Sequence, residues 1–287
     1  MSYTIAVAGK GGTGKTTLSA LIISYLLRAG RKPVLAVDAD PNSNLNEALG
    51  IKYDRTVVST IDEIMSKKEE LSPGLTKERL LELHFQDALV ESPGFDLLVM
   101  GHTEGPGCYC HANNLLRGFM DKLKENYPYI VMDNEAGMEH LSRRTTRDVD
   151  LLLIIANPNP VSLRSARNIF KMTEKLDLAI KKSCLVINEN RPGGLNLQEF
   201  IPPTSHLIPL NPPLQKGEEG GFSLDLSFPH VVSGNPEGLS LPLLGQIPYD
   251  QEVERYSIEG LSFLNLPSDS PAFQSIKSIL SSSLPST

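Results

Sequence analysis

The segment that decides the fold is Gly9-Lys10-Gly11-Gly12-Thr13-Gly14-Lys15-Thr16-Thr17. It follows a short apolar run, Tyr3 to Ala8, that is typical of a buried strand, and it precedes Leu18 to Ala29, which is typical of a helix. In this context the pattern G-x-x-x-x-G-K-[ST] predicts a phosphate site. The glycines let backbone amides approach phosphate oxygens closely, and the helix N-terminus adds the positive end of its dipole.

The side chains of the loop predict what binds there. The charge of Lys15 suits the β- and γ-phosphates of a nucleotide, and the hydroxyl of Thr16 suits Mg²⁺. The alternative is a glycine turn that only joins a strand to a helix. We expect ATP to bind along the loop, at Gly11, Gly12, Thr13, Gly14, Lys15, Thr16 and Thr17.

Composition excludes several classes of protein. The 287 residues carry a formal net charge of −7, which argues against a main role on nucleic acid or on an anionic membrane. No run reaches about 18 apolar residues, and the chain enters a strand without a basic region, so we expect neither a membrane span nor a secretory signal. Three cysteines are too few for a disulfide framework, which favours the cytoplasm.

Strand-like and helix-like segments alternate about every 30 residues from the start to Asn188. Purely apolar runs such as Leu151-Leu152-Leu153-Ile154-Ile155 suit strands that are covered on both sides. Between Ile51 and Val90 the pattern predicts surface helices, one of them over Leu80 to Leu89. We expect an α/β fold, with residues 1–287 forming a single P-loop domain whose mostly parallel sheet has helices on both faces.

One stretch interrupts this pattern. Pro202 to Gly238 holds seven prolines and five glycines, a composition typical of a flexible segment. We expect residues 202–238 to form a poorly ordered surface insertion. A last strand over Leu241 to Ile247 and a serine-rich helix over Ala272 to Leu284 are predicted to follow it.

Polar residues follow the predicted strands and should meet at one edge of a parallel sheet. Asp38 and Asp40 end the second strand, Asp133 ends a later one, and Asn188 ends another. Asp133 suits a Mg²⁺-bound water, and Asp40 is placed to orient or deprotonate an attacking water. Gly137 can offer its amide to the γ-phosphate without a side chain in the way. The alternatives are that Asp40 caps the following segment and that Asp133 is a structural cap.

Lys10 narrows the family to which the phosphate loop can be compared. Lys10 to Thr17 resembles the deviant Walker A motif of the MinD/ParA/nitrogenase-iron-protein group of dimeric ATPases. The resemblance implies a homodimer in which Lys10 reaches the partner's nucleotide, with Lys10, Lys15 and Asp40 acting in hydrolysis. It also implies that Asp133 to Gly137 form a second switch, and that the adenine is held by Asn188 and Pro248. The alternative for Lys10 is a solvated loop lysine.

Cys108-Tyr109-Cys110 is the second chemical feature of the chain. The preceding Gly105-Pro106-Gly107 predicts a turn, in which both sulfurs can converge on one soft or borderline metal ion. Two sulfurs fill half of a tetrahedral shell, so a symmetric dimer would complete the site on its two-fold axis. The alternatives are a pair of idle thiols and a redox pair. Cys184 is expected in the core, and the candidate extra ligands are His102, His111 and His140.

Taken together, the motifs resemble a narrower family, the CooC type of ATPase that matures nickel carbon monoxide dehydrogenase. The resemblance rests on the lysine loop, the cysteine pair, and Asp133-Asn134-Glu135-Ala136-Gly137-Met138-Glu139-His140. It implies a metallochaperone that holds Ni²⁺ (Zn²⁺ also fits) between the Cys108 and Cys110 of two protomers. ATP and Mg²⁺ would drive delivery of the nickel to carbon monoxide dehydrogenase or a related nickel enzyme.

Three other functions stay open on the sequence. The first is an assembly factor that loads nickel into acetyl-CoA synthase. The second is a MinD/ParA-like positioning ATPase, for which the acidic balance and the serine-rich end supply no basic surface. The third is an electron-transfer ATPase with a [4Fe–4S] cluster, whose cysteines normally lie on separate loops, whereas Cys108 and Cys110 share one.

Overall fold

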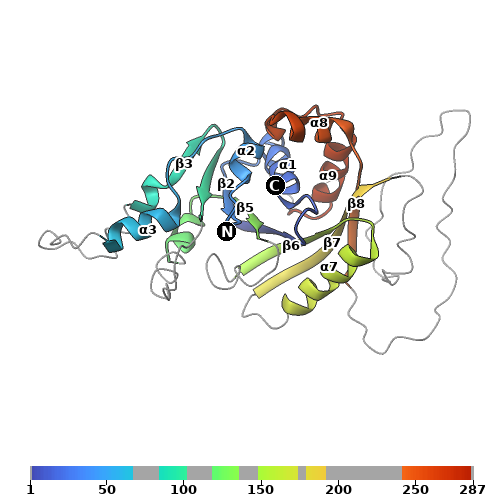
Figure 1. The fold of residues 1–287 in the computed structure, drawn as a ribbon, viewed down its shortest axis with the longest axis horizontal. Helices are drawn as coiled ribbons and strands as arrows, with labels where there is room; N and C mark the ends of the chain where they lie inside the picture. Colours follow the sequence, from blue (N-terminus) through green and yellow to red (C-terminus); the bar gives the residue numbers. More distant parts are fainter. Residues whose placement is uncertain are drawn as a thin grey trace, which may run out of the picture.

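The computed structural model describes residues 2–66, 84–101, 118–135, 148–173, 179–191 and 241–285. In these residues an eight-stranded sheet has the order β3-β4-β2-β5-β1-β6-β7-β8 (Figure 1). The strands are β1 Tyr3–Gly9, β2 Val34–Ala39, β3 Leu89–Ser92, β4 Phe95–Val99, β5 Tyr129–Asn134, β6 Asp148–Ala156, β7 Ala179–Asn190 and β8 Leu243–Pro248. The helices are α1 Lys15–Arg28, α2 Leu45–Leu49, α3 Val57–Ser66, α7 Pro160–Thr173, α8 Gln251–Glu259, α9 Pro271–Ser281 and the short 3₁₀ helix η2 Phe263–Asn265.

The expected α/β architecture is confirmed. Of the eight described strands, seven pair with a neighbour in parallel, and the eighth, β3, pairs antiparallel with β4. Successive residues of a strand point to opposite faces, so Ile5 and Val7 join one apolar cluster while Ala6 and Ala8 join another. The first cluster includes side chains of α1, α2, α8 and α9, and the second includes side chains of α3 and α7. Helices therefore cover both faces.

The region before β4 differs from its prediction. Leu80 to Leu89 was expected to be one helix, but residues 84–87 form the helical turn that the structure describes and Leu89 begins β3. Ser92 and Phe95 face each other across the two-residue turn Pro93-Gly94, in which Gly94 has φ 87°. A glycine in this position is the usual signal for a hairpin. The tight turn at Pro93-Gly94 therefore decided the structure of Leu89 to Ser92, although the apolar residues before it recur at helical spacing.

Other predictions concern element ends or residues outside the described ranges. The P-loop helix starts at Lys15 rather than Leu18, β7 is longer than expected, and α9 ends at Ser281. Helices α2 and α8 were not predicted. The insertion expected at 202–238 lies outside the described residues, so its order and the single-domain extent over 1–287 stay predictions. Among the described residues, no helix is long and apolar enough to cross a membrane.

Candidate nucleotide site at the carboxyl edge of the sheet

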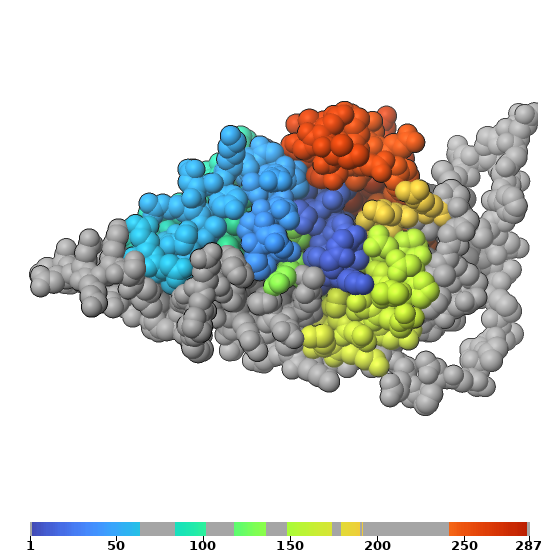
Figure 2. Space-filling model, viewed as in Figure 1, coloured from blue at the N-terminus to red at the C-terminus, as the bar shows by residue number. Residues whose placement is uncertain are grey.

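The parallel strands place their carboxyl ends along one edge, as expected for the polar strand ends. Gly9 of β1 pairs with Ile155 of β6, and Asp133 of β5 lies beside both Val7 of β1 and Asp38 of β2. In Figure 2 the dark blue start of the chain reaches the surface between the lighter blue residues that follow β2 and the yellow-green α7. The loop between β1 and α1 thus lies at the centre of the face shown.

The loop is shaped by close backbone contacts. A Cβ on Gly9 would lie 2.6 Å from the carbonyl oxygen of Ile155, so this position needs glycine. Gly14 has φ 89°, and a Cβ there would lie 2.5 Å from Nδ2 of Asn188. Inside the turn, the Thr13 hydroxyl donates to the carbonyl of Lys10 at 2.8 Å. The sequence folds this way because only glycine accepts these positions.

The start of α1 is open to an anion. Gly14 is its N-cap and offers no side-chain cap to the first amides. Lys15 is 7% exposed, and its Nζ lies 3.5 Å from the Lys10 carbonyl, curled over the loop. The amides, the helix dipole and the Lys15 charge together form a site that fits phosphate.

Asp133 is an acidic group in contact with this helix. It is 1% exposed, Ser19 of α1 donates to its Oδ1 at 3.3 Å, and its Oδ2 accepts no hydrogen bond from the described residues. Burial raises the pKa of Asp133 to about 6, against the lowering effects of the Thr16 hydroxyl, the Lys15 charge and Ser19. A buried carboxylate oxygen without a partner, next to a threonine hydroxyl, fits a hydrated Mg²⁺. The residues present therefore fit a magnesium nucleotide.

Asp38 and Asp40 occupy different environments. Asp38 is fully buried and accepts backbone N–H bonds from Leu45 at 2.9 Å and Asp40 at 3.1 Å. Burial, with repulsion from Asp133, raises the pKa of Asp38 to about 7 despite these hydrogen bonds. Asp40 is half-buried at the edge, and its Oδ1 accepts the backbone and side-chain N–H groups of Asn42 at 2.9 and 3.0 Å.

Lys10 and Asn188 flank the loop on its outer and inner sides. The Lys10 side chain is exposed, whereas Asn188 at the end of β7 donates from Nδ2 to the Thr13 carbonyl at 2.9 Å. Asn190 of β7 pairs with Pro248 of β8, so the two strand ends that were predicted to hold the adenine lie side by side. The structure thus brings the loop, Asp133, Asp40 and Asn188 to one edge. Their roles toward ATP stay predictions.

Some predicted site residues lie outside the described part of the chain. These are Gly137, Cys108, Cys110, His102, His111 and His140. Within the described ranges, no group of three or more His, Cys, Asp or Glu side chains could hold a metal ion. Cys184 is buried on β7, as predicted. The nickel or zinc site of the cysteine pair therefore stays a prediction.

Two contributors to the site were missed by the sequence reasoning. Ser19 bonds Asp133 from four positions beyond Lys15, on the same face of α1, and that spacing was the available signal. Arg191 stacks 4.1 Å from the centre of the Tyr249 ring, just beyond the paired ends of β7 and β8. Nothing in the sequence signals this second contact, because it depends on the pairing of two distant strands.

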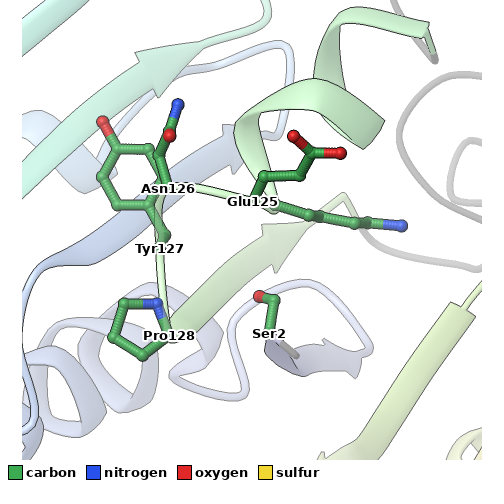
Figure 3. Close-up of a pocket in the computed structure, with 6 residues that line it drawn as sticks. Ser2, Glu125, Asn126, Tyr127 and Pro128 are labelled. Carbon is green, nitrogen blue, oxygen red and sulfur yellow. The ribbon is translucent and has the colours of Figure 1, made fainter.

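A cavity of about 580 Å³ lies at the opposite edge of the sheet (Figure 3). It is lined by residues that precede β1 and β5, namely Ser2, Lys124, Glu125, Asn126, Tyr127 and Pro128. The phosphate loop is at the other end of these strands, so this cavity is separate from the candidate nucleotide site.

Comparison with known proteins gives the following matches. A family model described as an AAA domain matches residues 2–186. An uncharacterised ATP-binding protein of Methanocaldococcus jannaschii is 34% identical over 277 residues, 96% of each chain. The carbon monoxide dehydrogenase accessory protein CooC of Rhodospirillum rubrum is 30% identical over 276 residues, covering 91% of this chain and 89% of that protein. The structure of the septum site-determining protein MinD of Pyrococcus horikoshii, complexed with Mg-ADP, superposes with a TM-score of 0.61 at 19% identity, covering 97% and 94% of the two chains, and shows a common fold.

Proposed function

The chain belongs to the AAA domain family whose model matches residues 2–186, and from this premise we propose that it is an ATP-dependent nickel chaperone for carbon monoxide dehydrogenase. Membership of the family makes it an ATP-binding P-loop ATPase of the MinD/ParA group. The proposal adds a dimer, a nickel ion and a client enzyme. A cytoplasmic location, where the thiols stay reduced, belongs to the proposal as well.

The observation that carries the proposal is the 30% identity to CooC over nearly the whole of both chains. The sequence adds Cys108 and Cys110, two thiolates of the kind that bind Ni²⁺ or Zn²⁺. Half of a tetrahedral shell per chain suits a face-to-face dimer, and the exposed Lys10 lies on a face from which it could cross to a partner. Nucleotide and dimer would then favour each other by the same free energy.

In this proposal the nucleotide edge drives the cycle. Lys15 and the amides before α1 bind the phosphates, Thr16 and Asp133 hold the hydrated magnesium ion, and Asp40 orients or deprotonates the attacking water. Gly137 donates an amide to the γ-phosphate, while Asn188 and Pro248 border the adenine. Hydrolysis releases the switches, which changes the hold of the cysteine pair on nickel. The nickel ion is the cargo delivered to the client.

Metal titration of the purified protein tests the metal assignment. We expect one Ni²⁺ per dimer in the wild type, with an affinity that changes when ATP is added. Replacing both cysteines, Cys108→Ala with Cys110→Ala, should abolish binding and leave ATP hydrolysis largely intact. Cys184→Ala is the matched control, because it removes a buried core thiol and should keep the metal. Tight binding of one Ni²⁺ per dimer by the double variant would show the assignment to be wrong.

Size measurement with a non-hydrolysable ATP analogue tests the dimer. Lys10→Ala should weaken nucleotide-driven dimerisation, because it removes the positive charge offered to the partner's phosphates. Lys32→Ala is the control, since this exposed lysine precedes β2 at the opposite edge of the sheet. If Lys10→Ala dimerises like the wild type, the cross-interface role of Lys10 is refuted.

A second candidate is a positioning ATPase, which the common fold with MinD favours. Such a protein needs a surface for a polymer or a membrane. Helix α9 does not supply one, because its apolar residues Phe273, Ile276 and Ile279 are buried in the core. Vesicle co-sedimentation with ATP separates the two functions, since the nickel chaperone is expected to stay in the supernatant.

The remaining alternatives differ in client or in cofactor. An acetyl-CoA synthase assembly factor would share the nickel site, so activation assays with each apo-enzyme separate the two clients. An electron-transfer ATPase would purify brown without oxygen because of its iron–sulfur cluster, whereas a Ni²⁺ or Zn²⁺ protein would not.

A further inference from the structure

Asp38 is a buried carboxylate to which the proposed cycle gives no task. It is fully buried near the end of β2, and the two residues after it, Ala39 and Asp40, are half-buried. Its backbone carbonyl accepts the N–H of Met100 at 2.9 Å, which fixes the strand end against the residue that follows β4. A charged group is costly to bury, so its retention here calls for a purpose beyond packing.

The side chain of Asp38 holds both ends of one loop. Oδ1 accepts the N–H of Asp40, the first residue after β2, and Oδ2 accepts the N–H of Leu45, the first residue of α2. Asn44 is the N-cap of α2 but makes no side-chain cap bond. Asp38, seven residues before Leu45, therefore caps the N-terminus of α2 in place of Asn44. Each of its two carboxylate oxygens holds one end of the loop.

The loop between these two ends is strained and needs such support. Ser43 has φ 48°, a left-handed conformation that is unfavourable for a residue with a Cβ. The turn is closed by the N–H of Ser43, which donates to the Asp40 carbonyl at 3.0 Å. A strained backbone conformation persists where surrounding contacts hold it in place, and the two hydrogen bonds to Asp38 are such contacts.

Asp40 depends on this support. Its carboxylate is engaged with Asn42 in the same loop, so it must turn away from Asn42 to reach a water at the phosphate edge. Its backbone N–H donates to Asp38 Oδ1 at 3.1 Å, a bond that does not involve the Asp40 carboxylate. The Asp38 bond thus determines the point about which Asp40 can turn.

We propose that Asp38 is the positioning residue of ATP hydrolysis, holding the loop from Asp40 to Leu45 so that Asp40 can reach the attacking water. Asp38 itself is buried behind the loop and acts through Asp40. The inference rests on the hydrolytic role of Asp40 in the proposed function, and it is independent of nickel, of the dimer and of the client enzyme.

Steady-state kinetics with nucleotide titration test this role. Asp38→Ala removes both bonds and should lower kcat by about 10-fold to 100-fold, as misplaced catalytic groups do. Asp38→Asn keeps one acceptor oxygen and should retain an intermediate kcat. The affinity for Mg-ADP should stay within about threefold in both variants, because the phosphate loop is untouched, and equal losses of kcat and Mg-ADP affinity would overturn the proposal.

The matched control is Asp150→Asn. Asp150 of β6 likewise accepts a backbone N–H, that of Thr4 at 2.7 Å, but at the far edge of the sheet. The Asp150→Asn variant should be less stable than the wild type and should keep the wild-type kcat. Thermal melting with Mg-ADP verifies that each variant is folded. An unchanged kcat in either Asp38 variant refutes the positioning role, and an unchanged kcat in Asp40→Asn refutes its premise. Loss of nickel binding affects the proposed chaperone function alone.

Discussion

The carboxylates at the two edges of the sheet lie in different environments: those at the amino edge are partly exposed and those at the carboxyl edge are buried. At the amino edge, Asp150 receives the Thr4 N–H and the Lys181 ammonium, and Asp96 receives the Tyr127 hydroxyl and the Ser92 N–H. At the carboxyl edge, Asp38 and Asp133 lie on adjacent strands, both with raised pKa values, and Asp133 Oδ2 accepts no hydrogen bond from the described residues.

The difference indicates which edge awaits a ligand. A fold tolerates an incompletely compensated buried charge where a bound partner supplies the remaining compensation, and elsewhere it pairs its charges. A hydrated Mg²⁺ with a nucleotide would bring the missing positive charge close to Asp133. The carboxyl edge is thus built for binding and the amino edge for stability, and the following changes test that division.

The largest effect is expected from Lys15→Ala. The variant loses a largely buried ammonium that contacts the Lys10 carbonyl in the phosphate loop, so Mg-ADP affinity should fall at least about 100-fold. Lys124→Ala at the amino edge is the control and should bind like the wild type. Fluorescent-nucleotide titration measures both. Similar affinities in the two variants would break the distinction between the edges.

The next effect compares Asp133→Asn with Asp150→Asn. Asp133→Asn removes a buried charge that its neighbours compensate only in part, so at pH 8 the nucleotide-free protein should gain about 1 kcal/mol of unfolding free energy while Mg-ADP affinity falls about tenfold. Asp150→Asn removes a paired charge, so it should lose about 1 kcal/mol and keep its Mg-ADP affinity. Denaturant unfolding measures the change in unfolding free energy of each variant, and nucleotide titration measures the change in its Mg-ADP affinity. The same sign of stability change in both variants would contradict the comparison.

A further expected effect, with no change to the sequence, is the pH dependence of stability without nucleotide. The pKa values of Asp38 and Asp133 rise from 3.8 in the unfolded chain to about 7 and about 6 in the folded one. The folded state therefore binds more protons between pH 4 and 7, and the stability present below pH 4 is lost as pH rises through this window. We expect these two groups to lower the unfolding free energy as the pH rises across it.

Denaturant unfolding at several pH values measures this slope. The pH dependence of stability also includes contributions from other carboxylates, so the slope of the wild type is compared with that of Asp38→Asn. The variant should lose less stability between pH 5 and pH 8. Parallel slopes would mean that Asp38 titrates like an exposed carboxyl.

The smallest effect is expected from Asn188→Ala. This change removes the bond that Nδ2 makes to the Thr13 carbonyl and leaves the phosphate contacts of the loop in place. Mg-ADP affinity should fall about threefold to tenfold, the value of one neutral hydrogen bond. Titration with inorganic pyrophosphate as a second ligand shows whether the loss comes through the loop, in which case both ligands weaken alike, or through the adenine, in which case pyrophosphate binding is unchanged.

Much of the fold could be predicted because its signals are local. The glycine loop between a strand and a helix, and apolar runs such as residues 151–155, predict a parallel sheet covered on both faces. The β3 hairpin could also have been found from Pro93-Gly94. Helix α8 has one buried side chain, Tyr256, so its apolar period was too weak to detect.

The sequence was sufficient to predict which residues form the site, but it did not predict the contacts between them. Strand ends identified Asp38, Asp40, Asp133 and Asn188, since parallel strands share one carboxyl edge. The strand order that places Asp133 between β1 and β2 depends on long-range pairing. So do the bonds of Asn188 to Thr13 and of Ser19 to Asp133, which join residues more than 100 positions apart.

Calorimetric titration of Mg-ADP into the nucleotide-free protein at pH 6.5, in two buffers of different ionisation enthalpy, tests the central claim most directly. At this pH the raised pKa values leave Asp38 and Asp133 partly protonated. Binding of the magnesium nucleotide at the carboxyl edge should favour their ionised forms and release protons. The account predicts binding with net proton release, which Asp133→Asn reduces. Binding with no proton release, or no binding at all, would contradict it.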